Sequence, residues 1–217
     1  MDFGKALTYQ FKDPEGLKKI LLVSLLSLIP VFGWMIAFGW SLKITRRVIE
    51  ADPQPLPEID IAGDLVRGLQ VFVINLVYYL PALVVAVPLS IIFLFSSFAF
   101  NDGRIAGSFW VLTMCCIMPA AILYGLAVGM FSAAAYGNIV SQGESLAAGF
   151  QVSRIFSLVK KSPVVYLLVL VGQVICGFIA FFGLVGCIVG IVFTSTYALS
   201  VMSHLYAQAY LEASKTN

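Results

Sequence analysis

The chain has 217 residues, of which 60% are hydrophobic and 11% are charged, and its mean hydropathy is +0.98. This composition excludes a water-soluble globule with an ordinary polar surface, so lipid must surround most of the protein. The net charge of +2 is too small to indicate nucleic-acid binding.

Long apolar stretches indicate membrane-spanning helices. Charged residues are absent from 69–101, 109–143 and 163–211, and each stretch exceeds the roughly 20 residues needed to cross a bilayer. None shows the alternation of a membrane β-strand, and a spanning backbone must satisfy its own hydrogen bonds. We therefore predict an all-α fold, a polytopic transmembrane helical bundle.

The amino-terminal segment predicts a helix that lies on the membrane surface. Its apolar and polar side chains fall on opposite faces: Phe3, Ala6, Leu7 and Phe11 against Lys5, Thr8 and Lys12. Asp13-Pro14 is expected to end this helix.

The first apolar block, 20–42, permits two layouts. It is long enough for one span, yet Pro30-Val31-Phe32-Gly33 at its middle is a strong break signal. If the block doubles back there, twelve of the thirteen basic residues share one face and only Arg104 lies opposite, as the positive-inside rule prefers. Each leg would then hold about 11 to 16 residues, roughly 17–24 Å, which is short of a core about 30 Å thick. We predict a short or re-entrant first hairpin.

A second surface helix is predicted after Leu56-Pro57-Glu58, because Pro57 suits a first helical position. Its apolar and charged residues also separate: Ile61, Leu65 and Leu69 against Asp60, Asp64 and Arg67. Two spans, about 69–99 and 109–137, follow it and form a hairpin around the turn Asn101-Asp102-Gly103-Arg104.

The third surface helix has the clearest pattern. Its two faces are Ala148, Val152, Ile155, Phe156 and Val159 against Arg154, Ser157, Lys160 and Lys161. The block 164–211 that follows is too long for one helix, and Phe182-Gly183-Leu184-Val185-Gly186 divides it into another pair of spans.

The predicted architecture is therefore a surface helix plus a hairpin, three times over: 1–50, 56–137 and 144–211 of one integral membrane domain, 1–217. The basic residues gather on one side of this layout. We expect a multi-pass protein of a prokaryotic cytoplasmic membrane with both termini cytoplasmic.

Small residues recur at every fourth position in two spans. They are Ala121, Gly125, Gly129, Ala133 and Gly137 in one span, and Gly186, Gly190, Thr194 and Ala198 in the last. Small residues at this spacing let helix backbones approach closely in lipid. The contact they serve is either packing within the chain or docking of another copy or subunit.

Polar side chains inside the spans are few, and none is a carboxylate or a lysine. Asn75 and Gln173 suit hydrogen bonds between helices, while His204 and Gln208, one turn apart, can act together on a polar group at the interface. These four residues form a possible polar site. No catalytic, phosphate-binding or metal-ligand motif accompanies them, and the four cysteines lie in apolar runs as packing thiols. We predict no enzyme activity, no cofactor and no metal site.

Basic residues near the predicted span ends and on the third surface helix are expected to bind anionic lipid headgroups. They are Lys43, Arg46, Arg47, Arg154, Lys160 and Lys161. The expected partners are therefore membrane lipids, together with other membrane protein subunits or a second copy of this chain.

Four local patterns, spread over nearly the whole length, carry a family resemblance. They are Phe11-Lys12-Asp13-Pro14; Ile29-Pro30 with Gly33 and Gly39; Arg46-Arg47 followed by Leu56-Pro57-Glu58; and His204-Leu205-Tyr206-Ala207-Gln208-Ala209-Tyr210. As a set they resemble an uncharacterised family of prokaryotic multi-pass membrane proteins, domain of unknown function 4013 (DUF4013). Ala207 departs from the pattern, which has glycine there, although a small residue is kept. The resemblance implies fold and membrane location and supplies no mechanism.

Two functions are compatible with these features. The first is a non-catalytic accessory, scaffold or assembly subunit of a larger membrane complex, with basic surface helices on the anionic leaflet and small-residue faces that dock helices. The alternative is a carrier or channel for a small solute or lipid. It would use spans kinked at Pro81, Pro88 and Pro119, together with Asn75, Gln173 and His204. We expect the first.

Overall fold

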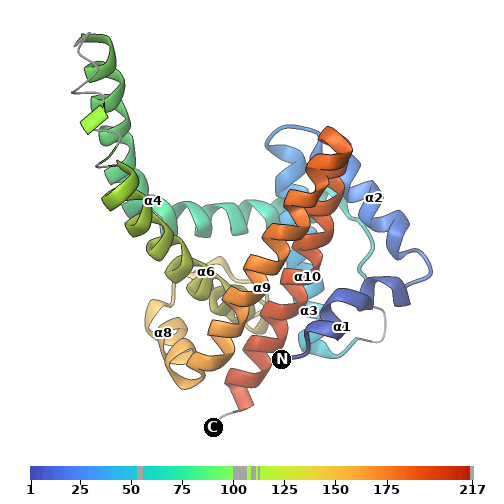
Figure 1. The fold of residues 1–217 in the computed structure, drawn as a ribbon. Helices are drawn as coiled ribbons and strands as arrows, with labels where there is room; N and C mark the ends of the chain where they lie inside the picture. Colours follow the sequence, from blue (N-terminus) through green and yellow to red (C-terminus); the bar gives the residue numbers. More distant parts are fainter. Residues whose placement is uncertain (53–55, 100–106, 109–110, 112, 216–217) are drawn as a thin grey trace. The chain divides into compact units, whose positions relative to one another are not determined.

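The computed structural model describes residues 1–52, 56–99, 107, 108, 111 and 113–215, and these form helices joined by turns (Figure 1). The predicted turn Asn101–Arg104 lies outside the described residues. In chain order the elements are α1 (Phe3–Thr8), the 3-10 helix η1 (Tyr9–Lys12), α2 (Gly16–Ser27), α3 (Phe32–Glu50), α4 (Ile61–Ala99), the π-helix η2 (Thr113–Ile117), α6 (Met118–Ser141), α7 (Leu146–Gly149), α8 (Val152–Lys161), α9 (Pro163–Phe182), the 3-10 helix η3 (Gly183–Gly186) and α10 (Cys187–Lys215).

The chain divides into two compact units. Unit 1 comprises Met1–Ile74 and Met130–Asn217, and unit 2 comprises Asn75–Gly129. In the part of the chain that the structure describes, three helical stretches are long and apolar enough to cross a membrane: Ile61–Ile92, Cys115–Ser141 and Pro163–Gly186. The all-α prediction is confirmed for the described residues.

The core of unit 1 is built around Trp40, which is fully buried and whose indole N–H donates to the carbonyl of Pro57 at 3.0 Å. The side chains of η1, α2, α3 and the segment before α4 surround it: Tyr9, Ile20, Val23, Ala37, Ile44 and Leu56. Phe193 and Tyr197 of α10 pack against this cluster. The amino-terminal elements are thereby attached to the last helix.

The helix is interrupted between α2 and α3, where Pro30 and Gly33 of the sequence predict a break. Val31 has a φ of 66°, an unfavourable conformation for a β-branched residue. Two residues later Gly33 lies directly against the backbone of Leu26, and a Cβ at this position would overlap the Leu26 carbonyl oxygen. Glycine is therefore required for α3 to fold back onto α2.

The backbones of α3 and α4 touch at two glycines in unit 1. Gly39 lies against the backbone of Asp64, and Gly68 lies against the backbone of Met35. A Cβ on either glycine would overlap a carbonyl oxygen of the other helix. Both pairs follow four-residue spacing, so one face of each helix makes the contact.

The predicted second surface helix is wrong as a separate element. Residues 61–69 are the first turns of the continuous helix α4. Its orientation also differs from the prediction, because Asp64 is fully buried whereas Ile61 and Leu69 are exposed. The close contact with α3 determines which side of α4 faces inward.

The helices α9 and α10 pack side by side after a turn at η3, within the predicted break. Gly183 lies against Gly190 and Thr194, and the Thr194 hydroxyl donates to the carbonyl of Ala180 at 3.2 Å. By contrast, the space beside Gly186 is open. Among the predicted small residues of α10, Gly190 is the one whose backbone contacts the backbone of Gly183.

The small residues of α6 have different environments along the helix. In unit 1, Ala133 is fully buried and Gly137 packs against the ring of Tyr210 from α10. In unit 2, Ala121 is exposed and nothing lies within 4 Å of a Cβ placed on Gly125. Gly129, between the two groups, is buried.

Unit 2 contains the second part of α4 and the first part of α6. The Tyr124 hydroxyl donates to the carbonyl of Tyr78 at 2.6 Å, one turn before Pro81. Because proline has no N–H, it interrupts the helical hydrogen bonds in this turn. Large apolar side chains of both helices remain exposed, including Leu83 and Ile122.

We predict that Gly39→Ala lowers the free energy of unfolding by about 1–3 kcal/mol, because the new methyl group meets backbone that cannot rotate away. Thermal denaturation in a mild detergent provides the measurement. Gly177→Ala in α9 is the matched control, since nothing lies within 4 Å of its Cβ. Equal midpoints for the two variants would contradict the α3–α4 contact.

Candidate functional site

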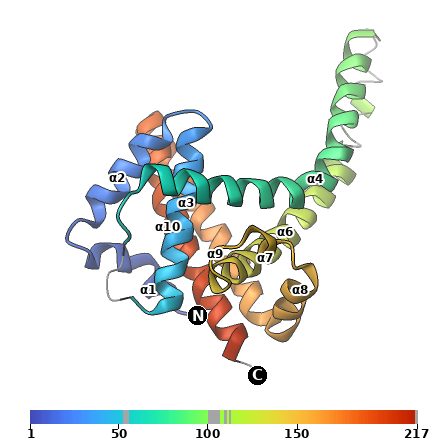
Figure 2. The ribbon, with the colours of Figure 1, turned by 180° about the vertical axis from the view of Figure 1, so that it is seen from behind.

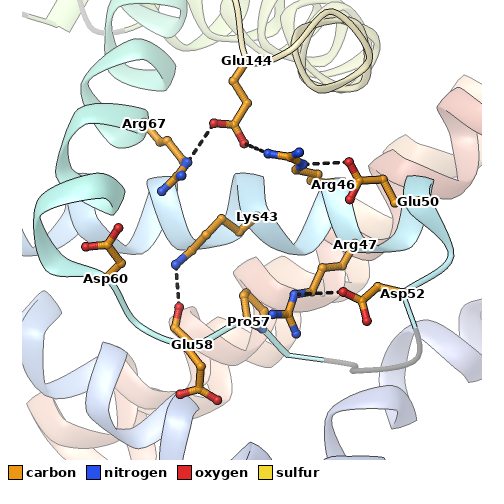
Figure 3. A pocket seen from close by; sticks show the side chains of 10 residues that line it. All are labelled: Lys43, Arg46, Arg47, Glu50, Asp52, Pro57, Glu58, Asp60, Arg67 and Glu144. Atoms are coloured by element: carbon orange, nitrogen blue, oxygen red, sulfur yellow. Dashed lines mark hydrogen bonds and ion pairs between the residues drawn. The ribbon is translucent and has the colours of Figure 1, made fainter.

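A charged cleft of about 330 Å³ lies in unit 1 beside the α3–α4 contact (Figure 3). It is lined by side chains from α3, from the segment before α4, from the start of α4 and from the loop after α6. The lining is mainly ionic: Lys43, Arg46, Arg47, Glu50, Asp52, Pro57, Glu58, Asp60, Arg67 and Glu144. Carboxylates and cations are nearly balanced, so the arrangement of their pairs determines what the cleft can do.

Asp64 is the buried anion behind this cleft. Its side chain is fully buried, and Oδ1 lies 2.8 Å from the Lys43 ammonium and 3.4 Å from the Arg67 guanidinium. The other oxygen, Oδ2, accepts from the backbone N–H of Asp60 at 2.9 Å. Asp60 in turn accepts from the N–H of Gly63, so the two aspartates cap the start of α4 reciprocally. A buried carboxylate is tolerated only with such partners.

Glu144 joins the loop after α6 to both α3 and α4. Its two carboxylate oxygens accept from Arg46 at 3.2 Å and from Arg67 at 2.9 Å, as Figure 3 shows. Its backbone has a φ of 63° directly after Gly143, which has a φ of 72°. This left-handed turn ends α6 with a bond from the Glu144 N–H to Ile139. The left-handed conformation is unfavourable for glutamate, and the two arginines hold it in place.

Cationic side chains hold the segment before α4 by donating hydrogen bonds to its backbone carbonyls. The Leu56 carbonyl accepts from both Lys19 and Arg47, and the Glu58 carbonyl accepts from Lys43. Arg47 also lies 3.7 Å from Asp52. Cations from α2 and α3 therefore fix this segment over Trp40.

The Lys19 ammonium is itself a buried ion-pair centre, 3.0 Å from Asp13 and 2.9 Å from Glu58. Burial disfavours its charged form, but hydrogen bonds to Glu58 and Asp13 outweigh burial and raise the pKa of Lys19 above its usual range. Burial likewise opposes ionisation of Asp13, but the bonds from Glu15 and Lys19 hold the pKa of that carboxyl below its usual range. Lys19 and Asp13 therefore both stay charged at neutral pH.

The six predicted lipid-binding residues fall into two groups. Three of them, Lys43, Arg46 and Arg47, take part in the cleft and are paired with Asp64, Glu144 and Asp52. The other three lie on α8 and are exposed: Arg154, Lys160 and Lys161. Their binding to lipid stays a prediction, and the α8 group presents its charge outward.

The four residues of the possible polar site do not form one cluster. His204 Nδ1 lies 2.9 Å from the Gln208 amide on α10. Gln173 donates to the Tyr206 hydroxyl at 3.4 Å, and Tyr206 lies on the opposite side of α10 from His204 because two residues turn a helix by about 200°. Asn75 belongs to unit 2. In the part of the chain that the structure describes, no three histidine, cysteine or acidic side chains converge as a metal-binding group.

Sequence reasoning missed Asp64 and Glu144 as site residues. The signal for Glu144 is its position after Gln142-Gly143, a helix-ending glycine. The signal for Asp64 is weaker, since its spacing to Gly68 matters only once Met35 and Gly39 of α3 are known to lie opposite. The site can attract and hold charged groups, and in this arrangement it holds the chain's own elements.

We predict that Glu144→Gln lowers the free energy of unfolding by about 1–2 kcal/mol, because two arginines lose a half-buried carboxylate. Glu50→Gln is the matched control: Glu50 also pairs with Arg46, but it is 53% exposed, and its loss should cost less than about 0.5 kcal/mol. Denaturation of both variants in the same detergent is the measurement. A Glu50 variant as unstable as the Glu144 variant would show that the loop is not held by this pair.

A family model matches most of the chain. No curated protein and no solved structure matches the chain. The family model described as "Protein of unknown function (DUF4013)" matches residues 22–191, which include α3, the segment before α4 and the loop carrying Glu144. The chain belongs to the DUF4013 family.

Proposed function

We propose that this protein is a non-catalytic accessory subunit of a larger membrane assembly, and that unit 2 holds a transmembrane helix of a partner protein. One observation carries the proposal: an apolar groove of about 480 Å³ within unit 2. Its walls come from α4 and from η2 and α6, and small side chains predominate: Pro81, Ala82, Val85, Ala86, Cys116, Ile117, Ala120, Ala121 and Tyr124.

Small residues in a groove favour a helix as its occupant. Ala82 and Ala86 lie one turn apart on α4, and Ala121 and Gly125 do so on α6. Where the lining is alanine, a third helix can approach the backbones of both walls and gain close van der Waals contact. The space beside Gly125 is open within 4 Å, so this part of the small-residue row remains available.

The amphipathic helix α8 supports a position at a membrane surface. Ile155 is buried within unit 1, whereas Val152 and Phe156 are 61% and 55% exposed. Arg154 and Lys160 are exposed on the same short helix. Apolar side chains beside cations suit insertion among anionic headgroups, in keeping with the proposed cytoplasmic leaflet of a prokaryotic membrane.

The arrangement of the chain ends supports the proposed topology, with both termini cytoplasmic. The amino group of Met1 lies 3.2 Å from Glu212, and Asp2 bonds to Gln208. Both ends therefore lie at the same end of unit 1 (Figure 1).

We predict that Ala86→Phe fills the groove and removes the partner. The wild-type protein, extracted from native membrane in a gentle detergent, should carry a stoichiometric membrane protein that mass spectrometry identifies. Ala86→Phe should lower its recovery by at least about tenfold, the effect of losing roughly 1.4 kcal/mol of docking energy. Val84→Phe is the matched control, because Val84 is on the same helix, 62% exposed and outside the groove.

The same extraction can contradict the proposal. Recovery of a lone protein with one defined lipid or solute would support the alternative, a carrier or channel, since an apolar groove also accommodates an acyl chain. Recovery of a homo-oligomer would make the occupant a second copy. Equal loss with Val84→Phe would show that bulk anywhere on α4 disrupts the assembly.

A further inference from the structure

We propose a binding site for a phosphate-bearing anion in a second cavity of unit 1, formed by the amino-terminal helices, the end of α3 and the end of α10. The cavity measures about 590 Å³. Figure 2 shows the end of α3 near the chain's amino terminus. Six of its lining residues carry the argument: Asp2, Lys5, Lys12, Arg47, Asp52 and His204. The site is separate from the groove of unit 2, so it does not depend on the proposed docking function.

The charges in this cavity favour an anion. Its two carboxylates are engaged, because Asp2 accepts from the N–H of Lys5 at 2.8 Å and Asp52 pairs with Arg47. The ammonium groups of Lys5 and Lys12 pair with no carboxylate of the described residues. Three cations (Lys5, Lys12 and Arg47) against two carboxylates (Asp2 and Asp52) give the lining a net charge of +1, which favours a compact anion such as a phosphate group.

The hydrogen bonds of Gln208 fix the state of His204. The Asp2 N–H donates to Gln208 Oε1 at 2.6 Å, and this bond fixes which end of the side-chain amide is oxygen and which is nitrogen. That nitrogen donates to the Asp2 carbonyl at 3.1 Å and lies 2.9 Å from His204 Nδ1. Because Nδ1 accepts from this amide, His204 is assigned the neutral tautomer with its proton on Nε2, and its side chain is part of the cavity lining.

The framework around the cavity is rigid. The Tyr9 hydroxyl donates to Ser200 at 3.1 Å, and the Tyr9 ring packs on His204 with 4.6 Å between centroids. Gln10 is fully buried and donates to the Ser200 hydroxyl at 2.9 Å. These contacts fix η1, which ends at Lys12, on α10, so the position of Lys12 at the cavity is held.

An exposed apolar side chain on an element that lines the cavity points to a lipid as the source of the phosphate. Phe11, next to Lys12 in η1, is 60% exposed. A headgroup in the cavity would leave its acyl chains beside such side chains. A free phosphate or a phosphorylated solute would use the same cations without that apolar surface, so binding assays can distinguish the two sources.

The test measures binding to the purified full-length protein in detergent. The probes are dioctanoyl phosphatidylglycerol, dioctanoyl phosphatidylcholine and inorganic phosphate. We expect saturable binding of one phosphatidylglycerol and weaker binding of phosphatidylcholine, whose headgroup has no net charge. Replacing both lysines in Lys5→Gln/Lys12→Gln should weaken phosphatidylglycerol binding about 30-fold.

Matched variants distinguish loss of this site from a general loss of positive charge and from misfolding. Arg154→Gln/Lys160→Gln removes the same charge from α8 and should leave the affinity of this site within about twofold. Lys5→Arg/Lys12→Arg should restore binding. Val48→Phe, which fills the cavity from α3 without changing charge, should also weaken binding.

The outcomes are decisive in both directions. Phosphatidylglycerol binding that phosphate cannot displace supports a lipid site, and displacement by phosphate at equal concentration supports a soluble phosphate ligand at the same site. Equal affinity for phosphatidylglycerol and phosphatidylcholine would overturn the proposal. So would an equal loss of affinity in the α8 variant, or unchanged binding by a folded Lys5→Gln/Lys12→Gln protein.

Discussion

The buried carboxylate of Asp64, at the point where the backbones of α3 and α4 touch, is the constraint on which unit 1 depends. Gly39 and Gly68 bring the two helices so close that Asp64 has no access to water. Removing a carboxylate from water costs several kcal/mol, so Lys43 and the N–H of Asp60 are required to offset that cost. The close packing of α3 and α4 therefore requires the ion pair between Asp64 and Lys43.

This constraint divides the basic residues between two tasks. Lys43 and Arg46 are directed toward carboxylates within the chain and hold α3, α4 and the loop after α6 together. Lys5 and Lys12 line a cavity, where the proposed phosphate would compensate them, and Arg154 and Lys160 of α8 are exposed. The positive-inside pattern treats all of these residues alike, although only the second group remains available for a ligand.

Local features of the sequence were predictable and long-range contacts were not. The break at Pro30–Gly33 and the two faces of α8 follow from residue properties within one turn or one helix. By contrast, Asp64 and Arg67 share a helix face that suggests exposure to solvent, and its burial requires Met35 and Gly39 from a distant part of the chain. The pairing of Glu144 with Arg46 also joins residues 98 positions apart. A single sequence carries no information on such pairs.

The most direct test of the Asp64 constraint is a double-mutant cycle with Lys43→Met and Asp64→Asn, measured as free energy of unfolding in mixed detergent. Each single variant leaves a poorly compensated charge, so the double variant should be more stable than the sum of the two losses predicts, by about 1–3 kcal/mol. Losses that add to within about 0.5 kcal/mol would show that the two residues act independently. That result would contradict the proposed role of the buried pair.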